Sequence, residues 1–173
     1  PGIRQKVYVA RKSDIVKWPT LPDTAASAMN ELATYEGNFE MASDAKFHSI
    51  QLTLNKGQIE WESQGEKPSR TFLNKATFHH PEGDEDAAAF ARQAISDDLV
   101  YVVQIRNGKF RVLGNEMFET DTKPGGTTGE GTTGEAGTTL EVEVTDVCPA
   151  PFYTGTLVTD EGTLNCETGE IAS

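Results

Sequence analysis

Apolar and polar residues alternate with a period of two through much of this chain. The clearest case is LEVEVT at residues 140–145, where Glu141 and Glu143 separate three apolar side chains. Because successive side chains of a β-strand point to opposite faces of a sheet, such a segment has one buried and one hydrated face. The alternation predicts a mainly β fold whose strands carry a wet, acidic side.

The same alternation predicts further strands at residues 4–10, 38–42, 49–54, 58–64, 70–78, 110–113 and 152–159. Residues 49–54 and 58–64 flank Asn55-Lys56-Gly57 and predict a hairpin. Its apolar phase consists of Ile50, Leu52, Leu54, Ile59 and Trp61. We therefore expect Trp61 to lie in the core, whereas Glu60 and Glu62 share the hydrated face.

Residues 99–106 are apolar in both phases and predict a central strand, which returns through Asn107-Gly108 as residues 110–113. Residues 84–96 carry apolar side chains at three- and four-residue spacing behind acidic residues, which predicts a helix with a favourable N-terminal charge. A weaker helical spacing occupies residues 23–35, and two prolines within residues 11–22 suggest an extended N-terminal arm. Together these elements predict an α+β fold of about eight mostly antiparallel strands, a β-sandwich or partly closed barrel flanked by one helix.

The stretch KPGGTTGEGTTGEAGTTL resembles a linker, because it contains TTGE twice and little apolar surface. Only about thirty residues follow Leu140, fewer than usually fold alone, so residues 1–173 are expected to form a single domain. Residues 123–139 would then be a long, mobile loop of that domain, which could pair with a neighbouring chain on assembly.

A net charge of −12 argues against binding nucleic acid through its phosphates, which requires clustered Lys and Arg. The chain lacks an apolar run of membrane-spanning length and a signal-peptide pattern at its start, so we expect a soluble protein made in the cytoplasm, without membrane contact. Cys148 and Cys166 are the only cysteines, and we expect two reduced thiols in or near the core.

Catalytic motifs are missing from the sequence: it contains no GxSxG, P-loop, GxGxxG after a strand, or HExxH. His79-His80 precedes an acidic run at residues 82–86, but adjacent histidines on a strand point to opposite faces, and the run suits a helix N-terminus. We therefore predict no metal, no cofactor and no enzymatic activity. The competing hydrolase hypothesis would use Glu60 and Glu62, about 7 Å apart at Cα on one strand face.

Several segments, taken in order, resemble tail-tube-like virion proteins from phages and prophages of Bacteroidetes-type bacteria. They are VYVARKSDIVKWPTLP at the start, residues 35–39, residues 55–66, residues 97–100 after the predicted helix, RNGKFRVLGNE, and PAPFYTG at residues 149–155. The likeness covers most of the chain. The TTGE-containing stretch departs from it.

This resemblance implies a β-sandwich or barrel that assembles into six-fold rings, in which a hairpin from each subunit joins its neighbours around a channel. Stacked rings would form the phage tail tube, with the protein itself and other tail proteins as partners and DNA passing without specific binding. Acidic residues would suit a channel that repels phosphate, and the candidates are Glu60, Glu62, Glu141 and Glu143. Candidates for subunit or ring contacts are Trp18 and Asp14 in the arm and Phe90 in the predicted helix.

A second hypothesis is a small β-sandwich that binds a glycan or a protein through exposed aromatic residues. Its candidate contacts are Trp18, Phe152 and Tyr153. Since aromatic side chains are enriched at interfaces, their exposure would distinguish this hypothesis from the tail-tube one.

Overall fold

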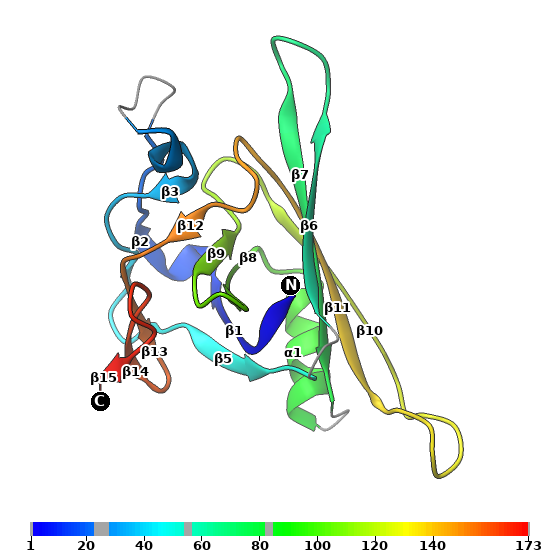
Figure 1. Cartoon of the computed structure of the whole chain (residues 1–173). Helices are drawn as coiled ribbons and strands as arrows, with labels where there is room; N and C mark the ends of the chain where they lie inside the picture. Colours follow the sequence, from blue (N-terminus) through cyan, green and yellow to red (C-terminus); the bar gives the residue numbers. More distant parts are fainter. Residues whose placement is uncertain (1, 23–27, 54–56, 82–84, 173) are drawn as a thin grey trace.

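Two β-sheets face each other across a hydrophobic core in the computed structural model (Figure 1). The structure describes residues 2–22, 28–53, 57–81 and 85–172. Strands and bridges account for 51% of the described residues, and the sheets do not close into a barrel. The predicted mainly β, sandwich-like α+β class is therefore confirmed, in the open form.

The first sheet has six strands and is buried on both faces. Its order is β3 (Thr34–Tyr35), β12 (Phe152–Tyr153), β9 (Phe110–Leu113), β8 (Leu99–Ile105), β1 (Ile3–Arg11) and β5 (His48–Gln51). Neighbouring strands are antiparallel except β12 and β3. The prediction of a central strand at residues 99–106 is confirmed, because β8 lies between β9 and β1 and its first five residues are buried.

The second sheet has four antiparallel strands, in the order β10 (Thr120–Thr127), β11 (Gly137–Asp146), β7 (Thr71–His80) and β6 (Gln58–Gln64). Its inward side chains, among them Phe78, Val142 and Val144, pack against those of β1 and β8. Helix α1 (Glu85–Ala94) adds the buried Ala94 and the partly buried Phe90 to this core, which confirms the predicted helix.

A second core covers the other face of the six-stranded sheet, where Phe39, Phe47, Leu157 and Leu164 pack on Val102 and its neighbours. The C-terminal sheet contributes β13 (Thr156–Thr159), β14 (Gly162–Asn165) and β15 (Ile171–Ala172). The remaining elements are η1 (Lys12–Asp14), β2 (Ile15–Lys17), η2 (Met29–Ala33) and β4 (Glu40–Met41), with β2 paired to β4. Burial from both sides explains why β8 shows no alternation.

The predicted hairpin of residues 49–54 and 58–64 is wrong. Strand β5 pairs with β1 in the six-stranded sheet, whereas β6 pairs with β7 in the four-stranded sheet. The expected turn at residues 55 and 56, together with Leu54, lies outside the described residues. The prediction failed because alternation specifies which face of a strand is apolar and not which strand is its partner.

The Gly/Thr-rich stretch is not the predicted loop. Residues 123–127 belong to β10 and pair with residues 137–141 of β11, so only residues 128–136 form the connection. This pairing is within one chain and contradicts the expected mobile excursion. Threonine favours extended backbone, and Pro124 is tolerated because β10 is an edge strand.

Other boundaries also differ from the predictions. The expected strand at residues 152–159 is divided into β12 and β13. The described residues contain fifteen strands instead of about eight, since several are only two to four residues long. Residues 29–33 form a 3-10 helix followed by β3, not an α-helix, while residues 23–27 lie outside the described residues. Residues 11–22 pack along the body through the buried Ile15 and the β2–β4 pair rather than extending from it.

The four-stranded sheet is longer than the body it covers. Figure 1 shows the β6–β7 hairpin passing beyond the body at the top of the view and the β10–β11 hairpin passing beyond it at the lower right. Trp61 is in the middle of β6, opposite the buried Asn74 of β7. Its side chain has the predicted inward phase but is 47% exposed, so the expectation that it lies in the core is wrong.

Candidate functional site

The outward face of the four-stranded sheet carries a row of charged side chains across all four strands. Asp121 of β10 is opposite Glu143 of β11. Glu143 is opposite Lys75 of β7, which in turn is opposite Glu60 of β6. Antiparallel register thus aligns three carboxylates and one ammonium group at spacings that allow direct interaction.

A second row lies two residues along the strands and consists of Lys123, Glu141, Thr77 and Gln58. Between the two rows is a shallow depression of about 110 Å³, lined in part by Glu60, Glu141 and Glu143. Glu62 is on the same face, and its Oε1 lies 3.4 Å from Lys75 Nζ. The structure therefore brings all four predicted channel residues to one face of one sheet. Their role in a channel remains a prediction.

This outward face is acidic. Five carboxylates, those of Glu60, Glu62, Asp121, Glu141 and Glu143, accompany only the two ammonium groups of Lys75 and Lys123, leaving three negative charges unbalanced. Both lysines take part in exposed ion pairs, at 3.4 Å with Glu62 and 3.8 Å with Asp121. Exposed pairs of this kind contribute little to stability. The face therefore presents its charge to solvent.

Sequence reasoning missed Asp121 and Lys123, because no element was predicted for residues 114–122 and residues 123–139 were taken as a loop. The available signal was the alternation of TDTK at residues 120–123, where Thr120 and Thr122 are buried and the charged residues are exposed. Lys75 could have been found from the phase of its own predicted strand.

Both edges of the four-stranded sheet are open in the described part of the chain. Strand β6 pairs only with β7, and β10 pairs only with β11. An open edge presents unpaired backbone groups that can form hydrogen bonds with a strand of another chain. The two edges lie on opposite sides of the acidic face, so a copy on either side could continue it.

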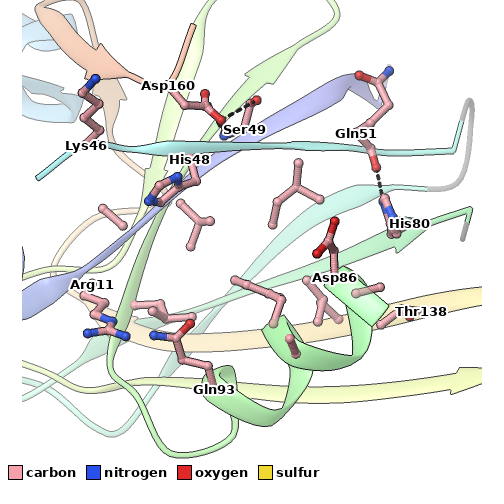
Figure 2. Close-up of a pocket in the computed structure, with 18 of the residues that line it drawn as sticks. Arg11, Lys46, His48, Ser49, Gln51, His80, Asp86, Gln93, Thr138 and Asp160 are labelled. Carbon is pink, nitrogen blue, oxygen red and sulfur yellow. Dashed lines mark hydrogen bonds between the residues drawn. The ribbon is translucent and has the colours of Figure 1, made fainter. Parts of the chain in front are cut away.

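A cavity of about 700 Å³ lies between β5 and α1 (Figure 2). Apolar side chains such as Val9, Leu99 and Leu140 line it, and polar groups surround it. The edge of β5 is capped there by side chains. Asp160 Oδ1 accepts a hydrogen bond from the Ser49 backbone N–H at 3.2 Å, and His80 Nδ1 lies 2.7 Å from the Gln51 carbonyl oxygen.

Two of the three predicted assembly residues, Asp14 and Phe90, line this cavity. Trp18 does not: it is half-buried against the second core, with its ring centre 5.4 Å from that of Phe39 in an edge-to-face arrangement. The structure therefore separates Trp18 from the other two residues. The Trp18 ring finds much of its apolar contact within its own chain.

His79 and His80 point to opposite faces of the sheet, as their adjacent positions predict. His79 Nδ1 lies 3.1 Å from Thr139 Oγ1 on the outward face, whereas His80 contacts Gln51. Among the described residues, no group of three or more His, Cys, Asp or Glu side chains could hold a metal ion. Glu82 and Asp84 of the acidic run lie outside the described residues.

Phe152 and Tyr153, two of the candidate contacts of the binding-module hypothesis, already make contacts within the chain. Tyr153 is 1% exposed, and its hydroxyl donates to the Thr156 carbonyl oxygen at 2.6 Å. The ring of Phe152 is covered by Lys109, whose Nζ lies 5.7 Å from the ring centre, and by Arg111 at 4.6 Å. Stacking on either ring would therefore require these contacts to be displaced.

Cys148 and Cys166 are both buried and unbonded, in agreement with the expected reduced thiols. Burial raises the pKa of Cys148 to about 11 and that of Cys166 to about 12. A thiol with a raised pKa remains protonated near neutral pH and is a poor nucleophile. These cysteines pack as small hydrophobic residues.

No protein-family model, curated protein or solved structure matches the chain. In the described part of the structure, no helix combines the length and apolar content that crossing a membrane requires.

Proposed function

We propose that this protein is a phage virion structural protein, the tail tube protein, which assembles into stacked rings that form the conduit for DNA. The proposal begins from the ordered resemblance of its segments to tail-tube-like virion proteins. That resemblance also supplies the six-fold symmetry and the location in the virion tail, with synthesis in the cytoplasm of the bacterial host.

The observation that carries the proposal is the four-stranded sheet, which is acidic on its outward face and open at both edges in the described residues. If β6 of one copy lies beside β10 of the next, the sheets of successive copies form one continuous wall. Its exposed surface would carry Glu60, Glu62, Glu141 and Glu143 from every copy. Such a surface repels phosphate, so DNA can slide along it without being retained.

Head-to-tail contacts between different edges are heterologous, and they close into a ring when the rotation between neighbours divides a full turn. The sheet edge of the isolated chain is then a free assembly surface rather than an aggregation hazard. The binding-module alternative receives less support, because Phe152 and Tyr153 already make contacts within the chain.

The test is electron microscopy of the purified protein over a range of concentrations and salt conditions, with the mass in solution measured in parallel. We expect rings of uniform diameter that stack into hollow tubes as the concentration rises. A protein that remains monomeric under every condition would contradict the proposal.

A further inference from the structure

The turns at the two ends of the four-stranded sheet carry opposite charge. The β6–β7 turn, residues 65–70, contains Lys67 and Arg70 against the single carboxylate of Glu66. The β10–β11 turn, residues 128–136, contains Glu130 and Glu135 and no Lys or Arg. All five of these charged residues are exposed. One turn therefore has a net charge of about +1 and the other of about −2 by the ordinary charges of their side chains.

The two turns point away from each other, beyond opposite ends of the body (Figure 1). Strands β7 and β11 are antiparallel neighbours through nine register pairs, which aligns the two hairpins along one direction. In the first turn, Ser69 N–H donates to the Glu66 carbonyl oxygen at 2.8 Å. In the second, Gly134 N–H donates to the Glu130 carbonyl oxygen at 3.1 Å. The charged residues of both turns are therefore part of a backbone with its own hydrogen bond.

A basic turn is unexpected in a chain with a net charge of −12. Within one chain it cannot reach the acidic turn at the other end of the sheet. A second copy, displaced along the strand direction, would bring its acidic turn toward the basic turn of the first copy.

We infer that the acidic β10–β11 turn of one copy contacts the basic β6–β7 turn of another copy in the adjacent ring. This inference rests on the proposed function and adds the contact between rings to it. Reversing one ring would place like charges together, which disfavours that orientation. Opposite charges at the two ends therefore give the stack a single polarity, and each contact is repeated around the ring.

The experiment uses charge reversal at one turn and then at both. Glu130→Lys with Glu135→Lys makes both turns basic, and Lys67→Glu with Arg70→Glu makes both acidic. Each variant should still form rings, but the concentration needed for tube growth should rise roughly tenfold, and more at low salt. The variant with all four substitutions restores opposite charges and should recover growth close to the original.

A matched control for Glu130→Lys with Glu135→Lys is Glu167→Lys with Glu170→Lys, which makes the same change in net charge on exposed residues outside both turns. It should leave tube growth unchanged. Three results would contradict the contact between rings even if rings still form. The like-charged variants could grow tubes as the original does, the four-substitution variant could fail to recover growth, or the control could lose growth equally. Absence of rings from the unmodified protein would overturn the proposed function, and this contact with it.

Discussion

The guanidinium carbon of Arg111 lies 4.4 Å from the centre of the Trp61 ring, and this contact joins the two large sheets. Arg111 belongs to β9 and Trp61 to β6. On its other side, Arg111 stacks on Phe152 at 4.6 Å, and its Nε donates to the Ala150 carbonyl oxygen at 2.8 Å. A largely buried cation thus anchors the β6–β7 hairpin to the body.

Replacing Arg111 with Met should lower the free energy of unfolding by about 2–4 kcal/mol, since it removes two cation–π contacts and leaves buried carbonyl groups without their donor. Urea denaturation measures this loss. In a Trp18→Phe background, Trp61 fluorescence should also shift to the red as its ring becomes more hydrated.

Lys109→Met is the control for this prediction. Lys109 also stacks on Phe152, at 5.7 Å, but it is exposed and makes no contact between the sheets in the described structure. Its loss should cost less than about 0.5 kcal/mol. Equal losses from the two variants would show that the Arg111 contacts do not anchor the hairpin.

Gly155→Ala should destabilise the region where β12 leads into β13. An added Cβ would collide with Asn38 Oδ1 and lie 2.8 Å from the Gly37 carbonyl oxygen. Asn38 Oδ1 accepts a hydrogen bond from Thr156 N–H at 3.1 Å, so its displacement would also break that bond. We expect a loss of about 2–3 kcal/mol in unfolding free energy, measured by thermal or urea unfolding.

Gly125→Ala provides the matched control, because a Cβ at Gly125 would have nothing within 4 Å. We expect a change within about 0.5 kcal/mol, or a small gain from the reduced freedom of the unfolded chain. If both alanine variants lose the same unfolding free energy, close packing does not explain the need for glycine at position 155.

Asp146 should make stability depend on pH between about 4 and 7. It is 3% exposed, and burial raises its pKa to about 6, although Val147 N–H donates to Oδ1 at 2.7 Å. The folded protein therefore holds this proton more tightly than the unfolded chain. The resulting stability is complete below the unfolded pKa and is lost as the pH rises through the folded value, a loss of about 2–3 kcal/mol.

Asp146→Asn removes the titration and keeps an oxygen that can accept from Val147. Relative to this variant, the original protein should lose stability between pH 4 and pH 7 in urea denaturation series. Asp121→Asn, which removes one carboxylate at an exposed position of β10, is the matched control. Parallel profiles for the original protein and Asp146→Asn would refute the assignment.

The local pattern of apolar residues correctly predicted those elements whose buried faces coincide with their apolar faces. Helix α1 has one apolar side and packs through Phe90 and Ala94, and β8 is apolar in both phases because a core lies on each side of it. The outward phase of Glu60, Glu62, Glu141 and Glu143 followed from the same rule. Alternation therefore predicted most of the residues on the acidic face. It could not predict the strand register that aligns their side chains in rows across the sheet.

Pairing was harder to predict, since it depends on residues far apart in the chain. Strands β5 and β6 follow each other but belong to different sheets. Trp61 has the inward phase of its strand, yet it is 47% exposed, because the phase of a residue does not say how deeply its side chain is buried. Strand β10 was not predicted because it contains Pro124 and two glycines, which are uncommon in strands. Its extended backbone is stabilised by the long pairing with β11.

The acidic face gives the last prediction, which tests the channel residues in assembled tubes. Replacing Glu60, Glu62, Glu141 and Glu143 with Lys changes the charge of each copy from these residues by eight units and would convert a repelling wall into a binding one. Such tubes should retain duplex DNA at low salt and release it steeply as salt rises, with a slope of about −0.9 for each phosphate neutralised. Co-sedimentation of DNA with tubes measures this.

The matched variant carries the same number of Glu→Lys changes at Glu31, Glu36, Glu167 and Glu170, which are exposed on elements outside the four-stranded sheet. As free subunits, the two variants should bind DNA similarly, because each gains a basic surface. Once assembled, only the first set should protect DNA from nuclease, since an enclosed wall excludes the enzyme and an outer surface does not. Equal nuclease sensitivity in both tubes would mean that the acidic sheet does not line the channel.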